Sequence, residues 1–85
     1  MKPTKLLERL LDGSLRNVDF GDFTHLIEAF GFQLDHVRGS HHFYFHPGVA
    51  EVLNLQPYRG EAKPYQIRQF LDLVERYNLQ LEDRT

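Results

Sequence analysis

A cluster of histidines beside a serine is the part of the sequence best suited to chemistry. It lies in the run Arg38-Gly39-Ser40-His41-His42-Phe43-Tyr44-Phe45-His46-Pro47. An imidazole exchanges protons near neutral pH, because its ordinary pKa is about 6.5. A glycine-serine turn offers backbone N–H groups and a hydroxyl to a phosphate. The run therefore indicates acid–base chemistry on a phosphate ester.

The histidines stand on a predicted strand, residues 41–46, which is rich in aromatic residues and bounded by glycine-containing turns. Successive strand residues point to opposite faces of a sheet. We expect Phe43 and Phe45 to face the core, with His41 at the edge of that face. The opposite face, left open, would then carry His42, Tyr44 and His46.

Metal binding and serine hydrolysis fit this run poorly. On a strand, His42 and His46 lie roughly 13 Å apart at about 3.3 Å per residue, and His41 faces away from His42. Zinc needs all its ligands about 2 Å from one centre. Ser40 sits on the histidines' own strand, and the sequence contains no nucleophile elbow. We therefore predict neither a metal, nor another cofactor, nor a hydrolytic triad.

RNA cleavage needs less from the protein, because the 2′-hydroxyl of the substrate is itself the nucleophile. The protein must supply an acid or base and must stabilise the crowded phosphorane. His42 fits the first role, while the Gly39-Ser40 turn, Arg38 and Lys63 fit the second. From the residues alone, a histidine pair that merely decorates a strand edge stays an equal alternative.

Composition limits the class of protein. The chain has 85 residues, no cysteine and a net charge of −2. It begins without an apolar run, so the sequence predicts a cytoplasmic domain with no signal peptide and no membrane span. The window 36–70 carries two more basic than acidic residues, so the rest carries −4. A local positive field on an acidic protein is one interpretation of this imbalance, and ordinary scatter of surface charge is the other.

Periodicity predicts an α-α-β-β-β-α order. Apolar stripes indicate helices over residues 3–12, from an Asp19 N-cap to Gly31, and from about Pro64 to Asn78. Strands are predicted over residues 32–37, 41–46 and 51–56, joined by short connections into an antiparallel meander. The fold class is thus α+β, with the helices on one face of the sheet. We expect one domain over 1–85, with a helical extension (1–17), a core (18–78) and a frayed tail (79–85).

The run Gly39-Ser40-His41-His42-Phe43-Tyr44-Phe45-His46-Pro47 resembles the HicA toxin family, the small partners of HicB antitoxins. The family hallmark is a G-S-H-H or G-S-x-H turn that leads into a strand ending in His-Pro. The flanks agree: Gly31-Phe32 closes the preceding helix, Leu53-Asn54-Leu55 forms the next strand, and Ile67 to Leu71 lie in the last helix. The resemblance spans about Phe20 to Tyr77.

The resemblance implies a fold like that of double-stranded-RNA-binding domains. It also implies metal-independent cleavage of mRNA at one histidine, and silencing by a HicB-like antitoxin that covers this residue. The matching histidine is His42, which would be the general acid/base. The candidate RNA-binding residues around it are Arg38, Gly39, Ser40, His41, Tyr44 and Lys63. Residues 1–17 extend beyond the minimal family chain.

Two other functions remain open for the same fold. One is a non-catalytic RNA-binding module, and the discriminator is whether His42→Ala removes activity without reducing RNA affinity. The other is an interaction protein that only binds a HicB-like antitoxin, which would be harmless when expressed alone.

Overall fold

A computed structural model describes residues 1–82 and contains three helices and one three-stranded antiparallel sheet. The order α-α-β-β-β-α and the α+β class are those predicted from the sequence. The elements are α1 (Pro3–Leu11), α2 (Phe20–Ala29), β1 (Gln33–Arg38), β2 (His41–Phe45), β3 (Leu53–Leu55) and α3 (Pro64–Arg76). The strands are in the order β1-β2-β3, so β2 lies at the centre of the sheet.

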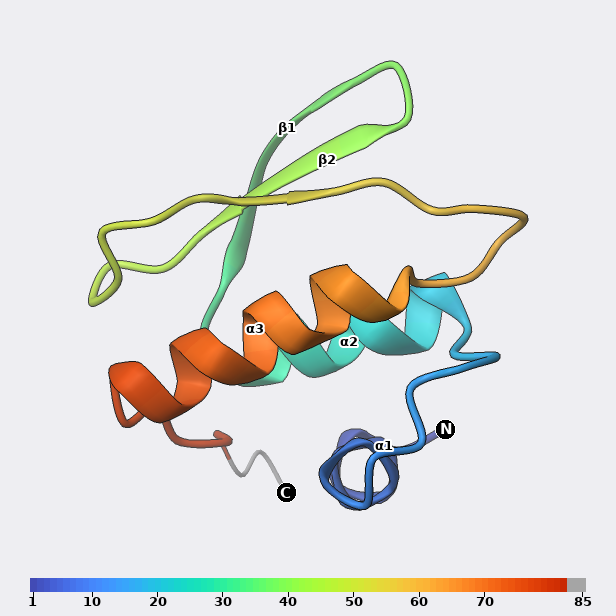
Figure 1. Cartoon of the computed structure of the whole chain (residues 1–85). Helices are drawn as coiled ribbons and strands as arrows, with labels where there is room; N and C mark the ends of the chain where they lie inside the picture. Colours follow the sequence, from blue (N-terminus) through green and yellow to red (C-terminus); the bar gives the residue numbers. More distant parts are fainter. Residues whose placement is uncertain (83–85) are drawn as a thin grey trace.

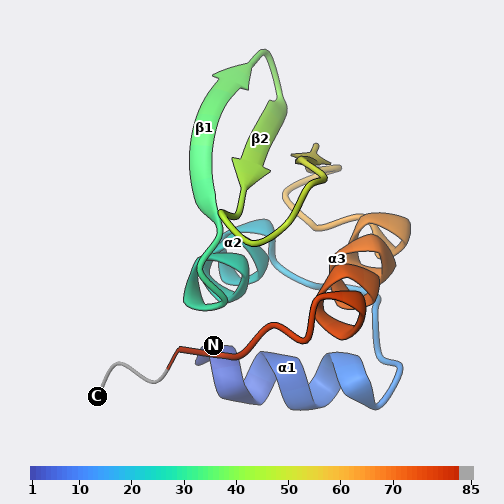
Figure 2. The same cartoon turned by 90° about the vertical axis from the view of Figure 1, so that its left-hand side faces the viewer.

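The elements form three layers (Figures 1 and 2). The sheet covers α2 and α3, which run side by side, and α1 crosses them on the side away from the sheet. Leu6 and Leu10 anchor α1, with 1% and 2% of their surface exposed, whereas Leu11 is 69% exposed. The predicted N-terminal helix therefore exists, and one stripe of it completes the core.

Both ends of α2 follow the local signals in the sequence. The carboxylate of Asp19 accepts a hydrogen bond from the Asp22 N–H at 2.9 Å, as predicted for an N-cap. At the other end the Gly31 N–H donates to the Glu28 carbonyl, and the Phe32 N–H donates to the Ile27 carbonyl. This pair of bonds is a Schellman motif, and Gly31 adopts the positive φ of 95° that it requires. Both predictions for this helix are confirmed.

The orientation predicted for β2 is wrong. Tyr44, not Phe43 or Phe45, faces the helices, and only 3% of its surface is exposed. The reason lies in the pairing with β3, where Tyr44 opposes Leu53 and His42 opposes Leu55, both fully buried. Paired residues share a face of the sheet, so the leucines carry Tyr44 and His42 to the helix side. Phe43 and Phe45 are half-buried on the outer face.

A β-bulge interrupts the pairing of β1 with β2. The register shifts between Leu34, which opposes Tyr44, and His36, which opposes Phe43, so Asp35 is the extra residue. The hairpin of β1 and β2 extends beyond the helices (Figure 2). As a result Leu34 and Val37 remain 45% and 49% exposed although β1 is part of the sheet.

The C-terminal parts of the chain differ from expectation in two places. In α3 the buried positions include Gln66 and Leu73 beside the predicted Ile67 and Phe70. The tail packs up to residue 82 instead of fraying: Leu79 and Leu81 lie against the core, and the Glu82 N–H donates to the Ala29 carbonyl at 2.8 Å. The rest of the predicted tail, residues 83–85, lies outside the described residues.

Candidate active site

His42 lies at the start of β2, on the side of the sheet that faces the helices. Val37 of β1 and Leu55 of β3 flank it in the sheet. Its ring meets the ring of Phe20, the first residue of α2, edge to face with centroids 5.0 Å apart. The side chain is half-buried. His42 therefore sits where the tip of the hairpin passes over the beginning of α2, rather than on the open face.

One hydrogen bond defines the tautomer of the His42 ring. Its Nδ1 lies 3.0 Å from the backbone carbonyl oxygen of Ser40. A carbonyl oxygen only accepts, so Nδ1 carries the proton and donates it. In the neutral ring the lone pair is then on Nε2, for which no hydrogen bond is found within residues 1–82. The ring is held in the form that a general base needs.

A chain of polar side chains continues from the same turn. The Ser40 hydroxyl accepts a hydrogen bond from Nε2 of Gln56 at 2.8 Å, and Oε1 of Gln56 accepts one from the Lys63 ammonium at 3.3 Å. Ser40 is exposed, while Gln56 and Lys63 are half-buried. Lys63 is the residue before α3, so three separate segments meet here: the hairpin turn, the end of β3 and the start of α3.

The turn itself is a two-residue hairpin loop. Arg38 and His41 are paired across it, and Gly39 has a φ of 60°. A positive φ at the first loop residue alone is typical of a type II′ turn, which matches the twist of the two strands. Gly39 is therefore required for geometry, and both Gly39 and Arg38 are exposed at the tip.

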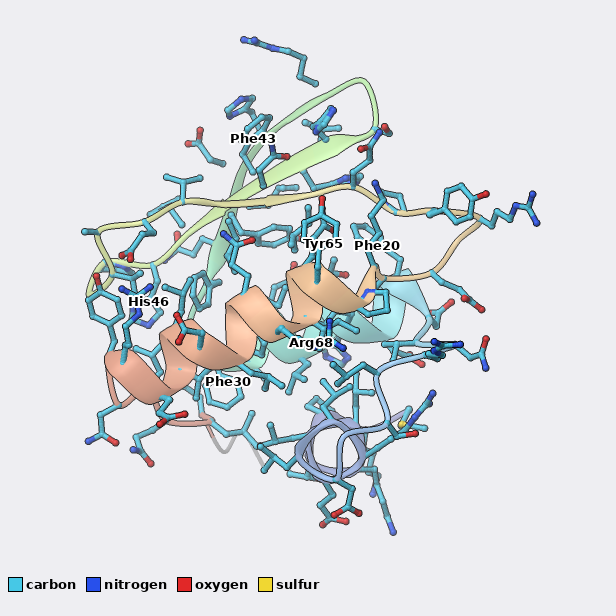
Figure 3. The ribbon with its side chains drawn as sticks, viewed as in Figure 1. Phe20, Phe30, Phe43, His46, Tyr65 and Arg68 are labelled. Carbon is cyan, nitrogen blue, oxygen red and sulfur yellow. The ribbon has the colours of Figure 1, made fainter. Side chains whose placement is uncertain are left out.

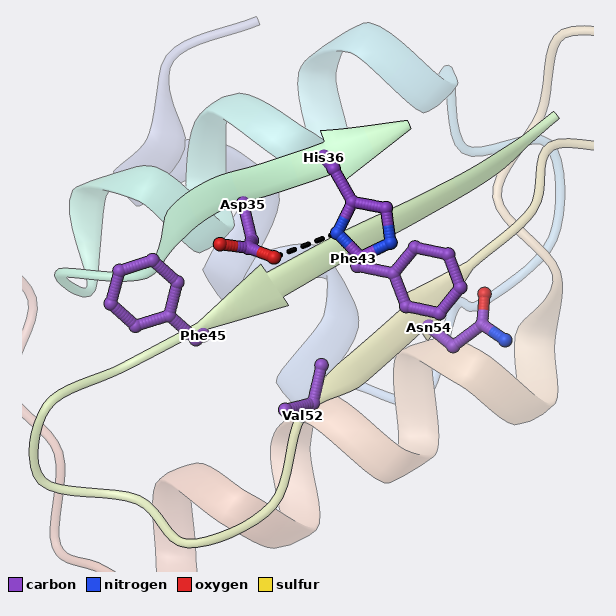
Figure 4. Close-up of a pocket in the computed structure, with 6 residues that line it drawn as sticks. All are labelled: Asp35, His36, Phe43, Phe45, Val52 and Asn54. Atoms are coloured by element: carbon purple, nitrogen blue, oxygen red, sulfur yellow. Dashed lines mark hydrogen bonds and ion pairs between the residues drawn. The ribbon is translucent and has the colours of Figure 1, made fainter. Parts of the chain in front are cut away.

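His41 belongs to the outer face. Its Nδ1 lies 3.0 Å from the side-chain oxygen of Asn54, and its ring is 6.4 Å from that of Phe43. His36 stacks on Phe43 at 4.3 Å and hydrogen-bonds Asp35 at 2.7 Å. Figure 4 shows the shallow depression on this face, lined by Asp35, His36, Phe43, Phe45, Val52 and Asn54. The depression and the His42 ring are on opposite sides of the sheet.

Two further residues of the histidine run, Tyr44 and His46, make contacts within the fold. Tyr44 is buried, and its hydroxyl donates to the Glu28 carboxylate at 3.4 Å. Burial, together with the nearby charge of Glu28, raises the pKa of Tyr44 above its ordinary value. Nδ1 of His46 accepts from the Gly48 N–H at 2.9 Å, and its ring packs edge-on against Phe32. Figure 3 shows His46 at the left of the molecule, well apart from Phe20, which lies near Tyr65.

The structure thus brings together only some of the predicted site residues. His42, Ser40 and Lys63 share one hydrogen-bonded cluster, with Arg38 and Gly39 at the adjoining tip. His41 lies on the other face of the sheet, and Tyr44 lies in the core. Gln56 was missed by sequence reasoning. The only signal for it was its place at the end of a predicted strand, before Pro57.

Neither a metal centre nor a membrane helix is found in the part of the chain that the structure describes. Within residues 1–82, no group of three or more histidine or carboxylate side chains is close enough to share a metal ion. In the same range, no helix has the length and apolar character needed to span a bilayer.

These observations define a class of protein: an α+β domain with a polar histidine site at the tip of a hairpin. A family model described as "HicA toxin of bacterial toxin-antitoxin" matches residues 21–75, which include the hairpin, the site and most of α3. The chain belongs to the HicA toxin family. This places it among the toxins of toxin–antitoxin systems, in a family whose members are generally RNases, and it implies an antitoxin as partner. No curated protein and no solved structure matches the chain.

Proposed function

We propose that the protein is an endoribonuclease toxin that cleaves mRNA with His42 as its general acid/base and without a metal ion. The observation that carries this proposal is the hydrogen bond from the His42 Nδ1–H to the Ser40 carbonyl, which leaves Nε2 as a proton acceptor. The Ser40–Gln56–Lys63 chain beside it supplies donors for a phosphate. Membership of the toxin family, whose members are generally RNases, supports RNA as the substrate.

The reaction follows from these groups. Nε2 of His42 takes the proton of a 2′-hydroxyl, and the freed 2′-oxygen forms a bond to the adjacent phosphorus. The bond from phosphorus to the 5′-oxygen breaks, and the imidazolium returns its proton to that oxygen. The products are a 2′,3′-cyclic phosphate and a 5′-hydroxyl. Lys63, Ser40, and the exposed Arg38 and Gly39 N–H at the tip are the candidate stabilisers of the developing charge.

The partner and the setting complete the proposal. A HicB-like antitoxin would silence the toxin in the cytoplasm by covering His42, which is half-buried and close to the exposed tip. Residues 18–78 would form the unit shared with the family, with a fold like that of double-stranded-RNA-binding domains, and residues 1–17 an added helical layer. Tyr44 is left out of the RNA contacts because it is buried.

The test is cleavage of a defined RNA by the purified protein, with and without excess chelator. We expect unchanged cleavage in chelator, and products that end in a cyclic phosphate or a 3′-phosphate. An RNA with a single 2′-deoxy nucleotide at the cut site should resist cleavage there, because its nucleophile is missing. Loss of cleavage in chelator that zinc or magnesium restores would contradict the mechanism, and so would cleavage at the 2′-deoxy position.

A further inference from the structure

Gln56, which follows β3, joins two of the proposed phosphate contacts. Its side-chain amide lies between the Ser40 hydroxyl and the Lys63 ammonium, at 2.8 Å and 3.3 Å. A lysine ammonium only donates hydrogen bonds, so the amide atom that faces Lys63 must be the oxygen. The amide NH₂ group therefore faces Ser40, and the direction of every hydrogen bond in the chain follows.

These directions decide what Ser40 and Lys63 can offer a ligand. The Ser40 oxygen accepts from Gln56, so its own hydrogen points away from the amide and is available to an acceptor. The Lys63 ammonium spends one of its three N–H groups on Gln56 and keeps two. Two donors, one neutral and one cationic, are thus prepared for an oxygen anion in the cluster that contains His42.

The backbone of Gln56 is itself held in place by the core. Its N–H donates to the side-chain oxygen of Gln66 at 3.2 Å. Gln66 is 4% exposed, and its amide NH₂ group contacts the Asn54 carbonyl at 3.4 Å and the Tyr65 hydroxyl at 3.2 Å. A buried amide on α3 therefore holds the end of β3 at a defined position. Hydrogen bonds of this kind, from buried groups to the backbone of a site residue, keep that residue in one geometry.

We propose that Gln56 is a positioning residue, which holds the Ser40 hydroxyl and the Lys63 ammonium as donors toward a phosphodiester of RNA. The identity of this ligand rests on the proposed function. Gln56 does not touch the reacting atoms; it acts through Ser40 and Lys63.

Gln56→Glu is the sharpest test, because it changes the chemistry with almost no change in shape. A carboxylate only accepts, so the Ser40 hydroxyl would turn inward to donate to it, and Lys63 would form an ion pair with it. The Ser40 donor would be withdrawn from the ligand, and the new carboxylate would offset the positive charge of Lys63. Gln69→Glu, at an exposed position of α3, makes the same change in charge and serves as the control. Thermal midpoints of all variants establish that they are folded.

The readout is affinity for an RNA with a 2′-deoxy nucleotide at the cut site, so that binding is measured without cleavage. We expect Gln56→Glu to weaken binding about tenfold, the size of one lost charged hydrogen bond, and Gln69→Glu to bind like the unsubstituted protein. Lys63→Ala, as a single substitution, should weaken binding by a similar factor. It should have a smaller effect in Gln56→Glu, where the new carboxylate already offsets the charge of Lys63.

The possible results separate this inference from the proposed function. Unchanged affinity in a folded Gln56→Glu, or full additivity of the Gln56→Glu and Lys63→Ala effects, would overturn the positioning role. If the protein binds RNA but leaves the all-ribose RNA intact, the nuclease proposal fails and the affinities still decide the role of Gln56. If the unsubstituted protein binds no RNA, both proposals are overturned.

Discussion

His41 and His42 are neighbours in the sequence with the same side chain, yet their surroundings differ. Nδ1 of each ring faces an oxygen acceptor, the backbone carbonyl of Ser40 for His42 on the helix side and the side-chain amide of Asn54 for His41 on the outer face. Only His42 shares a cluster with a cation, Lys63, through Ser40 and Gln56. At the residue scale, the partners of each ring, and not the residue type, are what favour His42 over His41 as the proposed acid/base.

Glu51 belongs to a second cluster of polar side chains, which affects the stability of the fold. Its carboxylate accepts a hydrogen bond from the Tyr77 hydroxyl and lies 2.8 Å from the Arg76 guanidinium. The hydroxyl first, and then the guanidinium, lower the pKa of Glu51 below its ordinary value of 4.5, although burial opposes this. The cluster joins the connection before β3 to the end of α3, opposite to the end of α3 that Lys63 precedes.

The Glu51 cluster makes stability depend on pH. A carboxyl group whose pKa is lower in the folded protein stabilises it at pH values above the ordinary pKa, and the gain is lost as the pH falls through the folded pKa. Glu51→Gln should therefore unfold at a lower temperature than the unsubstituted protein at pH values above the ordinary pKa of 4.5, and the gap should close as the pH falls below it, through the lower folded pKa. Tyr77→Phe removes the hydroxyl alone and should lose part of the same stability. Parallel profiles of midpoint against pH would contradict this account.

At the scale of the element, β2 shows where sequence reasoning stops. Residues 41–46 place aromatic rings on both faces of the strand, so alternation alone does not say which face is buried. The choice is made by Leu53 and Leu55, which oppose Tyr44 and His42 across the sheet. This information is non-local, because it depends on the register between two strands. The ends of α2 were predictable for the opposite reason: Asp19 and Gly31 bond only to residues a few positions away.

The corrected face of β2 can be tested with neighbouring residues. Tyr44→Ala should lower the free energy of unfolding by about 3–5 kcal/mol, because it empties a large buried volume. Phe45→Ala should cost about 1 kcal/mol, because its side chain is only half-buried on the outer face. Urea denaturation of both variants measures the difference. Equal losses, or a larger loss for Phe45→Ala, would restore the orientation that alternation suggests.

At the scale of the whole molecule, α1 adds a layer that the matched family region lacks. The family model begins at residue 21, after α1. Nevertheless Leu6 and Leu10 are almost fully buried, and Nη2 of Arg9 on α1 contacts the carbonyls of Arg16 and Asn17 in the connector to α2. We infer that α1 stabilises the domain from behind while the sheet side carries the site.

Leu10 and Leu11 test that role as a matched pair. Leu10→Ala should lower the free energy of unfolding by about 2–5 kcal/mol, the usual cost of truncating a buried leucine. Leu11→Ala should change it by less than about 0.5 kcal/mol, because Leu11 is exposed. Urea denaturation again gives both values. Similar small losses in the two variants would mean that α1 is a loosely attached extension.

The three-dimensional arrangement also explains how much of the site was predictable. The motif predicts His42 and Ser40 as site residues, and the local positive charge predicts Lys63. That Lys63 lies close to Ser40 depends on how β3 packs against α3, which the motif does not show. Gln56 makes that meeting possible and carries no charge or motif of its own. The fold places it there through Gln66, a buried residue that hydrophobic periodicity does not detect.

The most direct test of the central claim is the rate of RNA cleavage by purified His42→Ala, compared with His25→Ala at an exposed position of α2. Affinity for uncleavable RNA and thermal midpoint are measured alongside. Loss of the Phe20 contact should cost about 0.5–1.5 kcal/mol of stability and leave a folded protein. We predict that cleavage falls at least about 100-fold in His42→Ala with affinity nearly unchanged, and that His25→Ala cleaves normally. A folded His42→Ala that cleaves at the normal rate, or loses cleavage only in proportion to affinity, would contradict the account.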